Sequence, residues 1–196
     1  MQEAAHTASR HVISVLIADR PGILRDVTAA VSALDGNIDA IRQTVVAGYF
    51  TVMLTATFPE PCRSEDLQRR MQQAFAPGEA NIATTPYDAD HAKSHAPGER
   101  YVVTLTGIDH TGILSAVTGF MATRHINIED WNVIFDGNHV THVAEVTVPP
   151  NLDIKQLQIE FRHLAETLGL HAGIQHENIF RAISEVGPIK PLVTKR

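Results

Sequence analysis

The sequence contains a single cysteine, Cys62, among its 196 residues. One cysteine cannot form an internal disulfide, and it cannot supply the paired thiolates of a zinc or dithiol redox site. Cys62 lies beside Pro59 and Pro61 without an activating base, so an inert thiol is favoured over a nucleophile. This usage is typical of a reducing compartment, and we expect a cytoplasmic protein.

Positive charge is also scarce, with 16 Lys and Arg against 22 Asp and Glu and a net charge of −6. This balance argues against a general binder of phosphate backbones, which needs an excess of basic residues. No apolar run approaches the roughly 18 residues that span a bilayer. The first ten residues lack the apolar core of a signal peptide. We expect neither direct nucleic-acid binding nor membrane attachment.

Residue patterns typical of catalysis are missing as well. We find no nucleophile–base pair, no paired carboxylates and no phosphate-binding loop, so we expect neither an enzyme nor a cofactor. The eleven histidines do not suggest a metal site. His91 and His95 fall in a predicted linker, while His139 and His142 lie three apart on a predicted strand and therefore face opposite sides.

What the sequence does have is an internal repeat. Residues 12–59 align with residues 102–149 at a constant offset of 90 without a gap, and 12 of the 48 positions are identical. The identities gather at a loop, on a helix face and at a strand start. A unit duplicated with its geometry kept would show this distribution.

Each repeat predicts the order strand, helix, strand, strand, helix, strand. β-branched runs predict strands and periodic apolar stripes predict helices, with Ser64 and Asp153 as caps of the second helix in each unit. The predicted strands of the first unit span residues 11–18, 37–46, 49–58 and 81–85, and the last strand of the second spans 172–180. This order gives an antiparallel four-stranded sheet with both helices on one face. The predicted fold class is α+β, with two tandem ferredoxin-like βαββαβ domains.

Composition sets the predicted domain boundaries. Residues 86–99 contain prolines, a glycine and several charges but few large apolar side chains, which is typical of a linker. We therefore predict a first domain over 11–85, a linker over 86–99, a second domain over 100–181 and a loose C-terminal tail over 182–196.

One loop, between the first strand and the first helix, has the chemistry of a ligand site. A glycine permits a tight turn and close approach of a ligand, and the free N–H groups of a helix start suit a carboxylate. An aspartate can accept an ammonium group, and an asparagine that begins the next strand both donates and accepts hydrogen bonds. The candidate binding residues are Asp19, Arg20, Pro21, Gly22, Ile23, Leu24, Asn37 and Ile38.

The second repeat carries the same pattern with one departure, because Thr111 replaces the proline. The matching candidates are Asp109, His110, Thr111, Gly112, Ile113, Leu114, Asn127 and Ile128. Each set complements the two charged ends of an amino acid. His110 is interpreted as a polar loop residue.

The sequence resembles the ACT domain family in these two loops, in the helices that contain Val27-Thr28 and Val117-Thr118, and in the strands that start with Asn-Ile. The resemblance covers nearly all of both units. Two such units alone are similar to the glycine cleavage system transcriptional repressor family. The resemblance implies an amino-acid-binding regulatory protein that acts through a protein partner, with the ligand near an interface between units. It also implies a role in the control of amino-acid metabolism or its transcription. Strands that are apolar on both faces in places, such as Val12-Ile13 and Val102-Val103, indicate contact with another unit, and we expect a homodimer.

Other functions stay open from the residues alone. Gly22 and Gly112 could serve only their turns, which would leave a dimerisation or interaction module without a ligand. An RNA recognition motif has the same element order, but the third strands lack its Lys/Arg-Gly-Phe/Tyr setting and the chain is acidic.

Overall fold

The computed structural model describes residues 8–92 and 97–185. The chain divides into two compact units, Met1–Lys93 and Ser94–Arg196, and each is described by itself. Both predicted βαββαβ orders are confirmed, and each builds a four-stranded antiparallel sheet.

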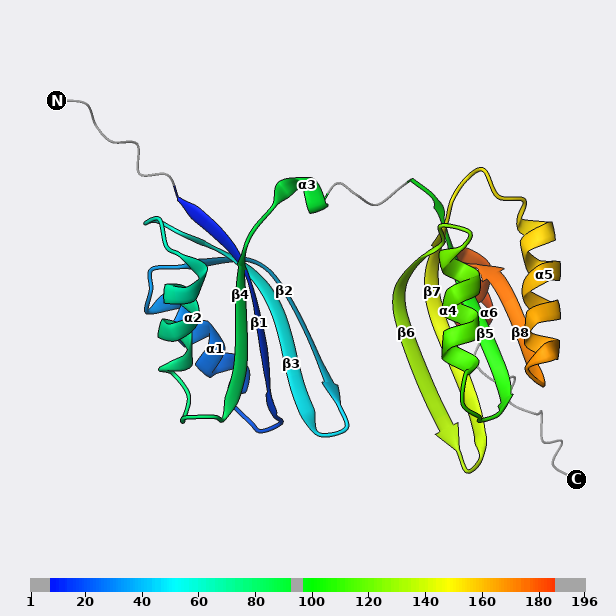
Figure 1. Ribbon diagram of the computed structural model, residues 1–196, viewed down its shortest axis with the longest axis horizontal. Helices are drawn as coiled ribbons and strands as arrows, with labels where there is room; N and C mark the ends of the chain where they lie inside the picture. Colours follow the sequence, from blue (N-terminus) through cyan, green and yellow to red (C-terminus); the bar gives the residue numbers. More distant parts are fainter. Residues whose placement is uncertain (1–7, 93–96, 186–196) are drawn as a thin grey trace, which may run out of the picture. The chain divides into compact units, whose positions relative to one another are not determined.

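Unit 1 has the strand order β2-β3-β1-β4, and α1 and α2 lie on one face of the sheet (Figure 1). A short helix, α3, follows the sheet within the predicted linker. The elements are β1 (Ser9–Ala18), α1 (Ile23–Ser32), β2 (Asn37–Val46), β3 (Tyr49–Phe58), α2 (Ser64–Gln72), β4 (Ala80–Pro86) and α3 (Ala89–Ala92).

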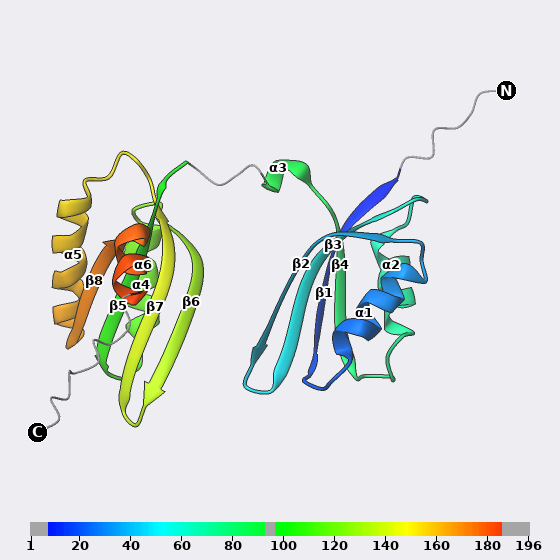
Figure 2. The ribbon, with the colours of Figure 1, turned by 180° about the vertical axis from the view of Figure 1, so that it is seen from behind.

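Unit 2 repeats the order as β6-β7-β5-β8. Its elements are β5 (Glu99–Ile108), α4 (Ile113–Ala122), β6 (Asn127–Asp136), β7 (His139–Val148), α5 (Ile154–Thr167), β8 (Leu170–His176) and α6 (Glu177–Glu185). Helices α4 and α5 cover one face of the sheet, and α6 lies on the other face against β5 and β8 (Figure 2). Val102 points to that second face and is nevertheless buried.

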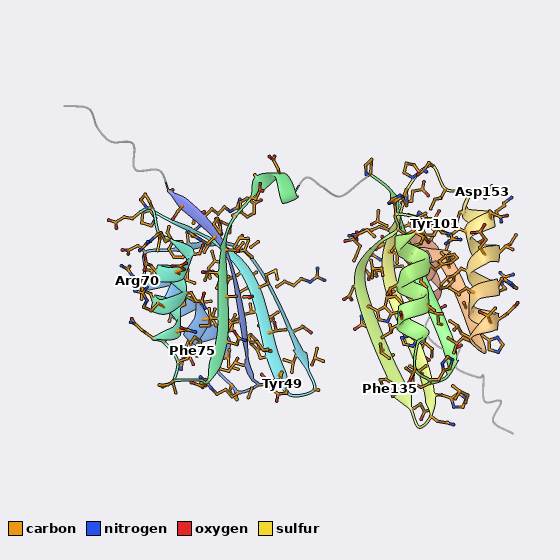
Figure 3. The ribbon with its side chains drawn as sticks, in the orientation of Figure 1. Tyr49, Arg70, Phe75, Tyr101, Phe135 and Asp153 are labelled. Atoms are coloured by element: carbon orange, nitrogen blue, oxygen red, sulfur yellow. The ribbon has the colours of Figure 1, made fainter. Side chains whose placement is uncertain are left out.

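Alternation along the central strands builds each core. On β1, residues 11, 13, 15 and 17 are buried beneath the helices, because successive side chains of a strand point to opposite faces. The helices contribute Ile23, Val27 and Val31 from α1. Of the apolar positions 23, 24, 27, 31 and 34 that predicted this helix, Leu24 is exposed and Leu34 is partly buried. The helices do not cover the hairpin ends, where Tyr49 and Phe135 are 58% and 64% exposed (Figure 3).

The end of unit 2 differs from the prediction. The strand predicted over 172–180 is β8 over Leu170–His176, and the chain then enters α6. The turn is fixed locally, because the Asn178 amide donates to Nδ1 of His176 at 3.2 Å. Residues 182–185 of the predicted tail belong to α6, and its remainder, 186–196, lies outside the described residues.

The cap predictions are only partly right. Asp153 caps α5 as predicted, because its carboxylate accepts from the amides of Lys155 and Gln156. Ser64 does not cap α2. That helix follows Arg63 without a side-chain cap, and the Ser64 hydroxyl lies 3.3 Å from Nδ1 of buried His11 instead. A buried imidazole needs a polar partner, and this contact provides one.

Candidate functional site

The loop between the first strand and the first helix has the same shape in both units. Gly22 precedes α1 with φ 92°, and Gly112 precedes α4 with φ 100°. Side chains with a β-carbon rarely adopt this left-handed conformation, so the turn itself requires glycine. The glycine carbonyls accept the amides of Asp26 and Ala116, which fixes the first turn of each helix.

The first amides of both helices have no side-chain cap. A helix start leaves N–H groups without intrahelical partners, together with a partial positive charge from the aligned peptide dipoles. Helix α2 also lacks a side-chain cap, so a missing cap alone does not distinguish these loops. The left-handed glycine and the adjacent aspartate set α1 and α4 apart.

That aspartate is held by its backbone and leaves its carboxylate available. The Asp19 amide donates to the Gly48 carbonyl at 2.8 Å, and the Asp109 amide donates to the Asn138 carbonyl at 2.9 Å. Both side chains are exposed. Each loop therefore joins its strand to the neighbouring hairpin turn, and it carries an exposed carboxylate three residues before its glycine.

Arg20 is engaged within unit 1. Its guanidinium donates to Asp26 at 3.0 Å and to Glu79 at 2.9 Å, and Asp26 also accepts from Arg25. The bonds to Asp26 and Glu79 raise the pKa of Arg20. Hydrogen bonds from Arg25 and Arg20 lower the pKa of Asp26, and those from the Ala76 amide and Arg20 lower that of Glu79. Arg20 thus ties the loop to α1 and to the start of β4.

His110 occupies the matching position in unit 2 and uses different partners. Its Nε2 lies 2.9 Å from the Leu168 carbonyl and its Nδ1 lies 3.1 Å from the Thr111 carbonyl. Carbonyls only accept hydrogen bonds, so the doubly protonated imidazolium satisfies both contacts. These two bonds, the one to Leu168 first, raise the pKa of His110. The predicted polar loop role agrees with this arrangement.

We predict that His110 makes the stability of unit 2 depend on pH. A raised folded-state pKa gives a contribution that is complete below the ordinary value of 6.5 and is lost as pH rises through the folded pKa. The stability difference between wild type and His110→Gln should therefore shrink as pH rises. Thermal unfolding of both proteins across neutral pH measures it, and a difference independent of pH would contradict the assignment.

The remaining loop residues are either buried in the core or exposed to solvent. Ile23 and Ile113 are only 1% and 2% exposed and hold the helix starts in the cores. Leu24 and Leu114 are exposed at 37% and 46% and present apolar surface at the loop. Pro21 and Thr111 are also exposed.

The two asparagines lie away from the loops of their own units. Asn37 begins β2 opposite Thr57, which also pairs with Arg10 near the start of β1, whereas the loop follows the end of β1. Asn127 has the same position and donates to Glu129 at 2.7 Å. Ile38 and Ile128 pack against the cores. A single unit therefore does not bring the asparagine to the loop.

Several residues around the loops have no signal in the sequence that ties them to the site. Glu79 is distant in sequence and contacts Arg20 only through folding. His142 is 3% exposed, and its Nδ1 accepts from the Trp131 indole at 3.2 Å, while its buried Nε2 has no partner among the described residues. Burial lowers the pKa of His142, and the charge of nearby Asp109 opposes this effect. His139 is exposed, which confirms that the two strand histidines face opposite sides.

A metal centre finds no support in the described part of the chain, where no group of three or more His, Cys, Asp or Glu could hold an ion. His91 and His95 fall where side chains are not described. Within residues 8–92 and 97–185, no helix is long and apolar enough to cross a membrane.

Comparison with known proteins places both units in one family. The ACT domain family matches residues 11–60, and a second ACT domain family matches residues 99–175. A UPF0237 protein of Streptococcus mutans is 33% identical over 82 residues, which is 42% of this chain and 93% of that protein. A UPF0237 protein of Methanococcus maripaludis is 28% identical over 89 residues, covering 45% and 99%.

Two solved structures share the fold over most of the chain. An unknown protein from Galdieria sulphuraria has a TM-score of 0.70 and 21% identity, covering 86% of this chain and 98% of that one. A proposed glycine cleavage system transcriptional repressor has a TM-score of 0.64 and 20% identity, covering 86% and 97%. With two family matches, a duplicated βαββαβ fold and a duplicated glycine loop, the chain belongs to the ACT domain family and carries two ACT domains in tandem.

Proposed function

We propose that the chain is an amino-acid-binding regulatory protein without catalytic activity, which acts in the cytoplasm through ligand-dependent contact with a protein partner. The observation that carries the proposal is the loop repeated at an offset of 90, with a left-handed glycine and an available carboxylate at each helix start. The likeness to a proposed transcriptional repressor supports control of amino-acid metabolism or its transcription.

In this proposal the ligand carboxylate accepts from the first amides of α1, and the carboxylate of Asp19 accepts from its ammonium group. Each charge-assisted hydrogen bond is worth about 1.5–3 kcal/mol. Arg20 and His110 hold their loops in shape, since hydrogen bonds within the unit already engage both side chains. Leu24 and Leu114 contact the side chain of the ligand.

The position of the asparagine suggests how the site is completed. β2 and β6 stand at sheet edges, where a further strand can pair. Suppose that two copies of β2 pair antiparallel about their centres. Asn37 of one copy then lies beside Val46 of the other copy, next to the glycine loop of that other copy. The amino acid would then lie between two ACT domains, and ligand binding would favour their association.

Thermal shift with a panel of common amino acids tests this function. We expect at least one amino acid to raise the melting temperature, and Asp19→Asn together with Asp109→Asn to remove the shift by weakening the ammonium contact. Glu65→Gln is the control, since Glu65 is exposed in the first turn of α2 and lies in neither glycine loop. If no amino acid stabilises the protein, the ligand-free interaction module becomes the better explanation.

A further inference from the structure

A second feature of unit 1 lies at the end of α1 remote from the glycine loop. A cavity of about 350 Å³ opens between α1, α2 and the loop that follows β3. Its floor is apolar, with Phe58 and Leu67 buried and Leu34 partly buried. A more open hollow of about 390 Å³ adjoins it and shares Leu34 and Arg70.

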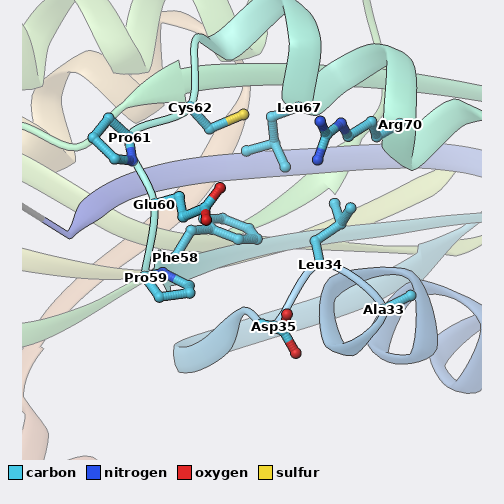
Figure 4. A pocket seen from close by; sticks show the side chains of 10 residues that line it. All are labelled: Ala33, Leu34, Asp35, Phe58, Pro59, Glu60, Pro61, Cys62, Leu67 and Arg70. Atoms are coloured by element: carbon cyan, nitrogen blue, oxygen red, sulfur yellow. The ribbon is translucent and has the colours of Figure 1, made fainter. Parts of the chain in front are cut away.

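Two opposite charges face this cavity without meeting. Figure 4 shows the Glu60 carboxylate and the Arg70 guanidinium on opposite sides of the space, with the apolar floor between them. Neither side chain has an ion pair or hydrogen bond within the described residues. The neighbouring Arg69, by contrast, pairs with Asp66 at 3.0 Å. Asp35 adds a second carboxylate to the lining.

The backbone around the cavity is held in place. The Ser9 hydroxyl donates to the Glu60 carbonyl at 3.0 Å. The Cys62 amide donates to the same hydroxyl at 3.3 Å. These bonds fix the loop between β3 and α2 against β1. The space is therefore a preformed feature of unit 1.

In unit 2 the equivalent helix positions carry side chains that contact one another. At the offset of 90, Ala30, Leu34 and Arg70 correspond to Phe120, Arg124 and Glu160. Arg124 stacks over the Phe120 ring at 3.6 Å and pairs with Glu160 at 2.8 Å. The helix position that carries Arg70 in unit 1, unpaired among the described residues, thus carries the ion-paired Glu160 in unit 2.

We propose that this cavity of unit 1 binds a free α-amino acid with an apolar side chain. Arg70 pairs with the carboxylate, Glu60 pairs with the ammonium group, and the side chain lies on Phe58, Leu34 and Leu67. A zwitterion complements this cavity because its carboxylate and ammonium group match the guanidinium and the carboxylate that stand exposed on opposite walls. This site is separate from the glycine loop and does not depend on the proposed function of that loop.

Cys62 lines the cavity, is partly exposed and is the chain's sole cysteine, so its alkylation reports this site alone. Iodoacetamide labelling of the full chain is followed by mass spectrometry with and without L-leucine or L-phenylalanine. At ten times the dissociation constant, occupancy predicts a roughly elevenfold slowing. The carboxylate analogue 4-methylpentanoate and the amine analogue 3-methylbutylamine should protect far less than leucine.

Variants decide whether the two charges act as proposed. Arg70→Gln and Glu60→Gln should each weaken protection by leucine at least about tenfold in concentration, the cost of one charge-assisted hydrogen bond. Arg69→Gln, on the same helix turn, and Asp19→Asn, at the glycine loop, should leave protection unchanged. The proposal is overturned if neither amino acid slows alkylation, if both charge variants keep full protection, or if Asp19→Asn removes it.

Discussion

Replacing Gly36 with isoleucine is expected to lower the free energy of unfolding of unit 1 by about 3 kcal/mol, through overpacking of the core. A β-carbon at Gly36 would lie 2.5 Å from Cε1 of Phe58 and 2.8 Å from Cγ1 of Val31. Both neighbours are buried core residues, and contacts this short require at least one of them to shift. Chemical denaturation of the variant measures the loss.

The second unit indicates how this damage can be repaired. At the offset of 90, Gly36 and Phe58 correspond to Ile126 and Val148, both of them buried. The backbone is the same, since the amides of Gly36 and Ile126 each donate to a carbonyl of the preceding helix at 3.1 Å. The two repeats therefore fill the same space differently. Unit 1 combines a glycine on the loop with a large phenylalanine on the strand, and unit 2 combines a larger isoleucine with a smaller valine.

Phe58→Val should accordingly rescue Gly36→Ile, with a coupling free energy of about 1–3 kcal/mol in a double-mutant cycle. Phe50→Val is the matched control, because Phe50 is a buried phenylalanine of the same strand that does not approach Gly36. Its cost should simply add to that of Gly36→Ile. If the losses of unfolding free energy of Phe58→Val and Gly36→Ile were also additive, the proposed exchange of small and large side chains would be contradicted.

Gly22→Val is expected to weaken amino-acid binding about 10- to 100-fold, which corresponds to one charge-assisted hydrogen bond of about 1.5–3 kcal/mol. The loop has φ 92° at this glycine, and a β-branched residue is a marked outlier there. The first amides of α1 would turn away from the ligand carboxylate. The strain should also lower stability by about 1–3 kcal/mol.

Calorimetric titration of Gly22→Val and of Gly78→Ala separates binding from strain. Gly78 also has a positive φ, 77°, and a β-carbon there would have open space around it, yet it lies in the loop before β4. We expect Gly78→Ala to lose stability but keep its affinity for the ligand. Equal losses of affinity in the two variants would indicate that general destabilisation, and not the loop, controls binding.

The repeat made most of the fold predictable from the sequence. The β-branched runs at 11–18 and 49–58 and the shared Asp-x-x-Gly-Ile-Leu loops appear twice at one offset, and both copies form the predicted elements. The prediction failed at residues 177–180, after the repeat ends. Apolar residues such as Ile179 and Phe180 suggested a continued strand there, but they belong to α6, which packs on the outer sheet face.

The site was less predictable because its parts depend on tertiary structure. Asn37 and the glycine loop were expected together, but α1 returns the chain toward the start of β1 before β2 begins, and this separation follows from the element order. The engagement of Arg20 by Glu79 joins residues 59 positions apart. The open groove of unit 1 depends on single side chains of three segments, which a sequence pattern does not show.

The most direct measurement is an amide NMR titration of the full chain with the amino acid that stabilises it most. We expect saturable shifts of the Ile23, Leu24 and Arg25 amides, which α1 leaves without side-chain caps. The same titration of Gly22→Val should leave these amides unmoved. If wild type binds an amino acid and its largest shifts lie away from both Ile23–Arg25 and Ile113–Ser115, the loop is not the ligand site.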